Sequence, residues 1–491
     1  MKKHLVLGLL AFASIIGGCG KTLQQAPQTI KGLDMAELGA RGGGRSPSMR
    51  VTNLSGQPLA DAQILIGTEV GKPFAQNFIT ADAQGNFSAP SEWTTPLPVT
   101  ISAPGYIRVT FMDQAPGVHS FSLRPVEGTG NFQLTGVTTG FQIKNGDGLV
   151  DFAVVIPALQ KRDFFSFDVS MVLSHQTDKI SIIGNDVELP SNASLPKQSE
   201  SYFFPINLEK PIYRMYFKNS GEQKVVTLRG QFPLKDVVDA FGKKQDFSEM
   251  INLFSIQGGS LETVKLSGAS THLDLSVNKL NFAQARKMTA PDFREDQEMV
   301  IAAAVTQTDN VLYPTDVKNL TPKQVRSLQV NGPNPLLVAA LKRKTEVARG
   351  ENKGTDRVSA AILPFAEGAE PHLLPLLDNP RLLSDSHLQI PAVKPVNGVN
   401  PSGTYATLAS ITESGTGKDA VTTLTTQWEV YAPAWASEIQ LPTWPKTMAH
   451  NGKMRWGVTL IGQSSNVSDG ADLGPGLLEN ATHATHSSLD F

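Results

Sequence analysis

The segment GQPLADAQILI occupies residues 56–66, and VTIS follows at residues 99–102. Each stretch holds a short apolar or alternating run, and turn-forming residues separate the two. Such runs between glycine, proline and asparagine are typical of half-buried antiparallel strands. The pattern extends from Met49 to Pro125, and it predicts that this part of the chain is built from β-strands.

Three stretches of this region match the motifs of one domain family: GQPLADAQI at 56–64, TADAQGNF at 80–87 and SAPGY at 102–106. Together they resemble the carboxypeptidase regulatory-like domain. The resemblance implies a small prealbumin-like β-sandwich over residues 48–126, which acts as a spacer or binding unit rather than as a catalyst. Gly85 can supply the positive φ of a tight turn after Asp82, and Phe87 then returns into the core.

Strand-like runs continue beyond residue 126, at residues 150–156, 165–169, 224–228, 298–305, 357–363, 427–431 and 454–461. The dipeptide Asn451-Gly452 precedes the last run, and Asn-Gly between strands is a strong signal for a β-hairpin. The segments 234–241 and 247–254 instead have apolar residues three and four positions apart. This spacing predicts two amphipathic helices that pack on the strands.

The patterns predict a multidomain, mainly β fold with a few short helices. The N-terminal prealbumin-like sandwich at 48–126 is followed by a β-rich domain with two amphipathic helices at 127–260 and a β-rich C-terminal domain at 261–463. Residues 464–491 are polar and glycine-rich. Such composition predicts a loosely ordered tail.

The first residues have the organisation of an export signal. Lys2 and Lys3 precede an apolar run from Leu5 to Ile16, which is shorter than the roughly 20 residues of a membrane-spanning helix. The run ends in IGGC at residues 16–19, which resembles the lipobox of bacterial lipoproteins. The resemblance implies a signal peptide at residues 1–18, cleavage between Gly18 and Cys19, and lipid on Cys19; an ordinary signal peptide with a chance cysteine is the alternative.

Lipid on Cys19 implies that the mature chain is tethered to a membrane, because two or more acyl chains anchor a protein stably. Residues 19–47 are polar and small, which predicts a flexible tether. Cys19 is the single cysteine of the chain, so neither an internal disulfide nor a cysteine-based metal cluster is expected. Gly20 stands where an aspartate would resemble an inner-membrane retention signal, which favours the outer membrane and leaves its periplasmic or surface face open.

The composition fits a folded chain with many turns, since hydrophobic residues make up 40% and there are 42 Gly and 32 Pro. Removal of the signal leaves 491 − 18 = 473 residues, more than one core usually supports. The mature chain then has 43 − 2 = 41 basic and 45 acidic residues, a formal balance of −4. With no basic stripe, nucleic acid is not an expected partner.

Four patterns offer candidate chemistry, and each has a plain alternative. NGDGLVD at 145–151 resembles a fragment of a calcium loop, but it lacks the later glutamate and also fits a tight turn. Ser194 and Lys197 have a Ser-x-x-Lys spacing, but Pro196 and the missing Lys-Thr-Gly motif favour chance. His483 and His486 suit a stray metal on a mobile tail, not a selective site. GTGKD at 415–419 lacks the Ser or Thr of a phosphate-binding loop. We therefore predict no metal site, no catalytic residue and no cofactor.

Four tryptophans, Trp428, Trp435, Trp444 and Trp456, gather in the last quarter of the chain. Exposed tryptophans stack on sugars or form protein-binding hot spots, whereas buried ones belong to a core. Trp428 and Trp456 lie in strand patterns and are predicted to be core. Trp435 and Trp444 lie near prolines in loop-like sequence and are the better surface candidates.

The expected function is that of a cell-envelope lipoprotein that binds a partner or acts as a structural spacer, without catalysis. Its expected partners are the membrane, through Cys19, and an envelope protein or polysaccharide. Two alternatives stay open: a hydrolase of envelope polymers with a site at a domain junction, and a surface adhesin.

Overall fold

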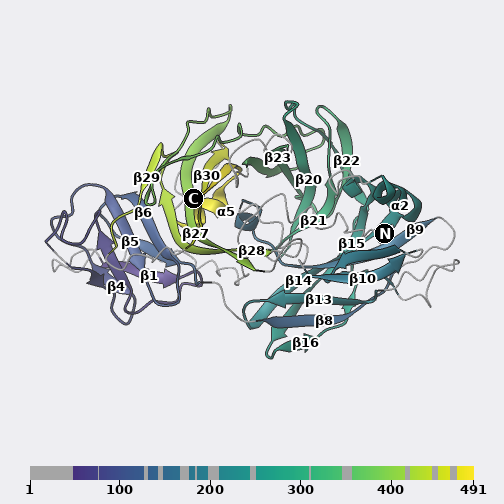
Figure 1. The fold of residues 1–491 in the computed structure, drawn as a ribbon, viewed down its shortest axis with the longest axis horizontal. Helices are drawn as coiled ribbons and strands as arrows, with labels where there is room; N and C mark the ends of the chain where they lie inside the picture. Colours follow the sequence, from purple (N-terminus) through teal and green to yellow (C-terminus); the bar gives the residue numbers. More distant parts are fainter. Residues whose placement is uncertain are drawn as a thin grey trace. The chain divides into compact units, whose positions relative to one another are not determined.

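The computed structural model describes residues 48–75, 77–126, 131–141, 148–165, 176–182, 185–196, 210–243, 250–308, 311–344, 357–414, 421–444, 452–464 and 473–491. The chain divides into two compact units (Figure 1). Unit 1 lies within residues 127–352 and 358–376, and unit 2 combines residues 24–126 with 377–491 and a short piece at 353–357. The described residues are mainly β-strand in both units, which confirms the predicted multidomain β-rich fold.

Unit 1 contains seventeen strands and two helices among its described residues. In chain order they are β8 (Phe132–Thr139), β9 (Leu149–Pro157), α1 (Lys161–Phe165), β10 (Thr177–Ile182), β11 (Asn185–Pro190), β12 (Ala193–Ser194), β13 (Ile212–Phe217), β14 (Gly221–Pro233), α2 (Leu234–Gly242), β15 (Ser255–Leu266), β16 (Ser270–His272), β17 (Leu275–Ser276), β18 (Leu280–Asn281), β19 (Gln284–Thr289), β20 (Gln297–Thr308), β21 (Val311–Lys318), β22 (Val325–Val330), β23 (Leu336–Arg343) and β24 (Arg357–Pro364). A 3-10 turn, η4 (Ile251–Leu253), precedes β15. Arg357, the first residue of β24, is counted with unit 2.

A β-sandwich forms one part of unit 1. Five strands pair in the order β12-β9-β14-β15-β18, and β13-β8-β16 forms a second sheet, with β17 also on β8 (Figure 1). Side chains of both sheets share one apolar core, which includes Leu134, Val155, Tyr213, Val225 and Leu266. The strands β21, β20, β23 and β24 pair in that order elsewhere in the unit.

The long strand β14 has apolar side chains on both faces of the five-stranded sheet. Successive side chains of a strand point to opposite faces, so Val225 packs in the sandwich core while Val226 and Leu228 pack on the other side with Ile156 and Tyr313. Apolar residues stand on both faces of this strand. This is why apolar residues stand at the consecutive positions Val225 and Val226 instead of strictly alternating.

Unit 2 contains fourteen strands and one helix among its described residues. They are β1 (Ser48–Asn53), β2 (Gln63–Ile66), β3 (Ile79–Thr80), β4 (Asn86–Ser88), β5 (Leu97–Ser102), β6 (Arg108–Gln114), β7 (Ser120–Leu123), β25 (Arg381–Ser384), β26 (His387–Gln389), β27 (Val399–Ser414), β28 (Val421–Ala432), β29 (Glu438–Gln440), β30 (Met454–Ser464), α5 (Pro475–Asn480) and β31 (His483–Asp490).

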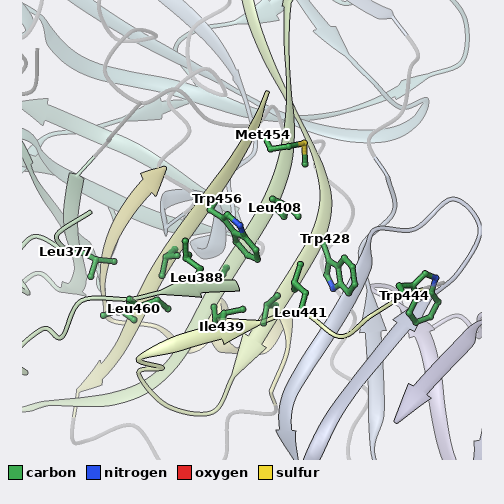
Figure 2. Packing of buried hydrophobic residues seen from close by; sticks show 14 of the residues in the cluster. Leu377, Leu388, Leu408, Trp428, Ile439, Leu441, Trp444, Met454, Trp456 and Leu460 are labelled. Carbon is green, nitrogen blue, oxygen red and sulfur yellow. The ribbon is translucent and has the colours of Figure 1, made fainter. Parts of the chain in front are cut away.

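Eight strands of unit 2 pair in the order β31-β30-β27-β28-β6-β5-β2-β3, and two small sheets, β4-β1-β7 and β25-β26-β29, complete it. The strands β28 and β6 run parallel, with Trp428 opposite Arg108. The core of this unit combines side chains of β27, β28 and β30 with Leu388 of β26 and Ile439 of β29 (Figure 2). Trp456 is fully enclosed there, with Leu408 and Leu460 in the same cluster.

Most of the predicted strands are present. The runs at 150–156, 224–228, 298–305, 357–363, 427–431 and 454–461 lie in β9, β14, β20, β24, β28 and β30. The turn at Asp82 is also confirmed, because Asp82 Oδ1 accepts hydrogen bonds from the backbone amides of Gln84 at 2.9 Å and Asn86 at 2.7 Å. Gly85 has a φ of 76° and Phe87 is buried, as the motif requires.

The predicted domain boundaries differ from the observed division. The boundary between 260 and 261 falls inside β15, which runs from Ser255 to Leu266 without a break. Residues 48–126 belong with 377–491, because β6 pairs with β28 through backbone hydrogen bonds. The predicted signal and tether, residues 1–47, lie outside the described residues.

The predicted loosely ordered tail is wrong for residues 473–491. They form α5 and β31, and β31 pairs with β30 over eight positions from His483 to Asp490. Leu477, Ala481 and Ala484 are buried. Backbone pairing to a central strand holds this polar segment, and composition does not report such pairing.

Three local predictions have mixed outcomes. Helix α2 is present as expected, but of the segment 247–254 the described part is residue 250, the 3-10 turn η4 and Phe254. Phe165 ends helix α1 instead of beginning a strand, and residues 166–169 are not described. In the described pairing, β30 neighbours β27 and β31. Asn451 and the residues just before it lie outside the described residues, so the hairpin through Asn451-Gly452 stays a prediction. No helix among the described residues is long and apolar enough to span a membrane.

Candidate functional site

The predicted lipidation site lies outside the part of the chain that the structure describes. Gly18 and Cys19 fall within residues 1–47, and Lys197 and the segment 415–419 are also undescribed. Cleavage before Cys19 and its lipidation therefore stay predictions.

The calcium fragment at 145–151 is described from Gly148 onward. Asp151 lies in β9, is 1% exposed, and accepts a hydrogen bond from Gln231 Nε2 at 3.2 Å. Its carboxylate thus belongs to the sheet interior. No group of three or more His, Cys, Asp or Glu residues that could hold a metal is found among the described residues.

Ser194 is enclosed in β12, and its hydroxyl lies 2.8 Å from that of Thr138. A serine nucleophile of the Ser-x-x-Lys type lies at the start of a helix. The strand position and full burial of Ser194 give it a structural role instead.

His483 and His486 do not lie on a mobile tail. Both are in β31, three residues apart, and residues at odd spacing on a strand point to opposite faces. His483 Nδ1 lies 2.9 Å from Thr482 Oγ1, and His486 Nδ1 lies 3.0 Å from Thr459 Oγ1. Their rings therefore do not converge on one metal.

The tryptophan prediction is confirmed for two residues and wrong for a third. Trp428 and Trp456 are 5% and 0% exposed, as expected for core. Trp444, which is predicted together with Trp435 as a surface candidate, is 5% exposed and packs against the Phe78 ring with centroids 4.5 Å apart. Trp435 is partly buried and donates its indole N–H to the Ile461 carbonyl at 2.8 Å. Figure 2 shows Trp428, Trp444 and Trp456 with the leucines around them.

Arg108 lies over two of these rings. Its Cζ lies 4.7 Å from the ring centroid of Trp428 and 4.7 Å from that of Trp444. A guanidinium over an indole face is attracted by the ring quadrupole, and more strongly when water is excluded. Trp428 also donates its N–H to Thr110 Oγ1 at 2.8 Å. Burial lowers the pKa of Arg108 to about 10, so it remains charged at neutral pH.

A second charged cluster of unit 2 surrounds Glu429. Its carboxylate is 3% exposed and accepts hydrogen bonds from the hydroxyls of Tyr405 at 2.7 Å and Tyr431 at 3.4 Å. Arg124 forms an ion pair with the same carboxylate. Burial, together with the charge of Glu429, raises the pKa of Tyr405 well above its ordinary value. This tyrosine keeps its proton and acts as a fixed donor.

In unit 1, Lys210 connects three elements. Its ammonium donates to the carbonyls of Ser191 at 3.2 Å, Ile212 at 3.1 Å and Ala193, and lies 3.0 Å from Asp178 Oδ2. Burial lowers the pKa of Lys210 to about 8. Arg214 pairs with the same carboxylate. These contacts join β10 and β12 to β13.

The three clusters were not found from the sequence, since no motif connects their members. Arg108 and Trp428 are 320 positions apart in the chain, and Arg124 and Glu429 are 305 apart. The sequence offers one signal for such a cluster, which is a single charged residue within an otherwise apolar strand. Such a residue marks an inward-facing charge only once the strand pairing is known. Chemically, the clusters hold cations against rings, carbonyls and carboxylates, and so they fix strand positions.

No protein-family model matches the chain, and no curated protein matches its sequence. Among solved structures, the Bacillus anthracis TIE protein is 9% identical with a TM-score of 0.16, covering 66% of this chain and 48% of that one. The chain thus spans about half the length of the TIE protein. BcpA, the major pilin subunit of Bacillus cereus, is 9% identical with a TM-score of 0.15, covering 66% of this chain and 97% of that one. At these TM-scores neither likeness carries an argument about function.

Proposed function

We propose that this chain is a cell-envelope lipoprotein that acts as a non-catalytic binding or structural module, held to the membrane by lipid on Cys19. The observation that carries the proposal is IGGC at residues 16–19, directly after a cationic start and an apolar run. Cys19 is also the single cysteine of the chain, so the thiol has no disulfide partner within it.

The described charge clusters support a structural or binding role. The carboxylates of Glu429, Asp178 and Asp316 each pair with a cation of their own unit. A general acid or base must reach the substrate with its proton-carrying atom. Carboxylates already engaged in ion pairs serve the fold instead.

The anchor is tested by labelling cells with an alkyne analogue of palmitate. Wild-type protein is expected to carry the label and to migrate as a chain cut before Cys19. The Cys19→Ser variant is expected to lose the label and to keep residues 1–18, because the hydroxyl cannot form the thioether. Thr22→Ser, in the adjacent polar segment, is the matched control and labels like the wild type. A labelled and processed Cys19→Ser protein would refute the anchor.

We further propose the outer membrane as the location, because Gly20 follows Cys19. Gly20→Asp is expected to shift the labelled protein from outer-membrane to inner-membrane fractions on a density gradient. Unchanged fractionation would contradict this location. Protease added to intact cells then separates a surface face, where the chain is cut, from a periplasmic one.

A binding role is tested by affinity capture from detergent-solubilised envelopes. We expect the wild-type chain to recover a stable envelope protein or polysaccharide. An unrelated lipoprotein, used as the control, is expected not to recover it. Recovery of nothing above that control would leave the structural role alone.

A further inference from the structure

Arg108 of strand β6 carries a charge for which the described residues of unit 2 supply no counter-charge. Its Nε and Nη1 are enclosed, and neither has a hydrogen-bond partner. The third nitrogen, Nη2, also has no hydrogen bond to the described residues but is not enclosed, so it faces solvent from a partly exposed side chain. Burial lowers the pKa of Arg108, and no neighbouring carboxylate acts to raise it.

Two indole rings flank this guanidinium. Its Cζ lies 4.7 Å from the ring centroid of Trp428 and 4.7 Å from that of Trp444, and Figure 2 shows the two rings apart from each other. The segment that carries Trp444 is held by a hydrogen bond of 2.7 Å from the backbone amide of Thr443 to the carbonyl of Thr68. The ring quadrupoles attract the positive charge but offer no lone pair to its N–H groups. The charge is therefore stabilised while its donors stay unpaired.

The nearby carboxylates of unit 2 already have partners. Glu429 follows Trp428 on β28, and successive side chains of a strand point to opposite faces. Glu429 therefore projects away from the indole of Trp428, and it pairs with Arg124. Glu69, in the loop after β2, pairs with Lys72. Neither of these carboxylates neutralises Arg108.

A guanidinium with enclosed, unpaired N–H groups and one nitrogen in solvent is suited to a ligand with two acceptor oxygens. A carboxylate can bind a guanidinium by two parallel hydrogen bonds along either of two edges, and Nη2 belongs to both. We propose that Arg108, between Trp428 and Trp444, binds the side-chain carboxylate of an aspartate or glutamate of a protein partner. The proposal rests on the binding role proposed above, but not on the lipid at Cys19.

The surroundings of Arg108 favour a protein over a polysaccharide as the partner. Its planar fork with one positive charge matches a carboxylate in both shape and charge. Trp428 and Trp444 are each 5% exposed, so neither leaves a ring face free to stack on a sugar. Val70 and Phe78 are partly exposed and pack on the same cluster, where they can contact the methylene groups of an acidic side chain.

The full-length protein in detergent is titrated with the peptide acetyl-Ala-Glu-Ala-amide, with tryptophan fluorescence as the signal. We expect a saturable change, because the carboxylate binds beside two indoles. The peptide with glutamine in place of glutamate is expected to bind at least about tenfold more weakly, since it loses the charge-assisted hydrogen bonds. Glucuronate, a sugar carboxylate, is expected to bind more weakly than the glutamate peptide.

Arg108→Met is expected to lose the preference for glutamate over glutamine, while its thioether can still pack on both indoles. Arg381→Met, an exposed arginine on β25 of the same unit, is the matched control and keeps the preference. The absence of a saturable change, equal binding of the two peptides by wild type, or an equal preference in wild type and Arg108→Met would overturn the proposal. Glucuronate binding as tightly as the glutamate peptide would overturn the assignment to a protein.

A second measurement does not depend on the folding of a variant. Crystals of the wild-type protein soaked in the glutamate peptide are expected to show its carboxylate within hydrogen-bond distance of Arg108 Nη2 and of either Nε or Nη1. Water alone at Nη2 would overturn the proposal. An envelope partner that wild type and Arg108→Met recover equally would also refute this site, yet it would leave the binding role standing, and labelling of Cys19 reports separately on the anchor.

Discussion

At Glu429 one carboxylate accepts bonds from two tyrosines and an arginine that come from three strands or loops of unit 2. A buried group of this kind is stable as a complete set, since removal of one member leaves the others desolvated and unpaired. The residue scale is therefore where single substitutions have the clearest effects.

The Glu429→Gln substitution is expected to destabilise unit 2 by about 2–4 kcal/mol, because it leaves Arg124 without its counter-charge. All five tryptophans, Trp93, Trp428, Trp435, Trp444 and Trp456, lie in unit 2, so tryptophan fluorescence during denaturant unfolding reports on this unit. Glu438→Gln is the matched control. Its side chain is 64% exposed in an ion pair with His387, and a change within about 0.5 kcal/mol is expected. Equal unfolding midpoints for the two variants would contradict the prediction.

The pKa of Lys210 predicts a dependence of stability on pH. In the folded chain it is about 8, below the ordinary 10.5 of an exposed lysine. Between these values the unfolded chain binds more protons than the folded one, so this group makes stability rise with pH over that window. The contribution is on the order of 1–3 kcal/mol. Denaturant unfolding followed by circular dichroism gives the free energy of unfolding at each pH. Its rise with pH is expected to be smaller in Lys210→Met than in wild type or in Lys287→Met, which is an exposed control. Equal slopes in all three proteins would refute the prediction.

Single residues also show what the sequence can predict. Phe87 and Trp456 are buried as their strand positions imply, because alternation reports which face a side chain occupies. Trp444 is different. The nearby prolines indicate that it lies in a loop, but they give no indication that Arg108 covers its ring. Arg108 and Trp444 are 336 positions apart, and a partner so distant in the chain leaves no trace in the local sequence.

At the scale of elements, close approach between strands β14 and β15 depends on glycine. A Cβ at Gly259 would lie 2.0 Å from the carbonyl oxygen of Thr227 and 3.4 Å from the Cα of Leu228. Such contacts with backbone cannot be relieved by a side-chain rotation. The pair β14–β15 is therefore more tightly constrained than its sequence indicates.

Gly259→Ala is expected to destabilise unit 1 by about 1–3 kcal/mol, because the strands must move apart to admit the methyl group. Gly268→Ala lies just beyond the same strand, where a Cβ would meet nothing within 4 Å. This control is expected to stay within about 0.5 kcal/mol of wild type. Calorimetry of the two variants tests the prediction. Equal unfolding midpoints would show that the strands can move apart without loss of stability.

The strand β31 shows where element prediction stops. Its sequence, HATHSSLD, lacks the apolar alternation of a strand, yet it pairs with β30 along its length, and Arg455 forms an ion pair with Asp490 at 2.5 Å. Backbone amides of residues 484–489 are expected to exchange with deuterium slowly, at a rate similar to those of β30. Exchange as fast as that of an unstructured terminal peptide would contradict this pairing and would support the loosely ordered tail that composition predicts.

At the scale of the whole molecule, the fold class was predictable and the division into units was not. Strand content can be predicted because short apolar runs between turn residues are visible in the local sequence along most of the chain. The order of strands in a sheet is set by pairing between distant segments. Thr110 and Trp428, joined by a hydrogen bond, illustrate a relation that no local pattern contains.

Residues 48–126 are therefore expected not to form a stable domain alone. Without β28, the strand β6 has a free edge, and Phe111 loses its stacking partner Tyr431. The isolated fragment is expected to give a poorly dispersed NMR spectrum, and co-expression with residues 377–491 is expected to restore dispersion. A well-dispersed spectrum of the fragment alone would show that it folds as an independent sandwich.

The parallel pairing of β6 with β28 has a consequence for synthesis. Ribosomes add about 5–20 residues per second, so the 318 positions between Thr110 and Trp428 take on the order of 15–60 s to emerge. Throughout that interval the nascent chain presents the unpaired edge of β6, which is a template for association with other chains. We therefore expect association with other chains to be most frequent before β28 has been made, and to fall once β28 covers the edge of β6.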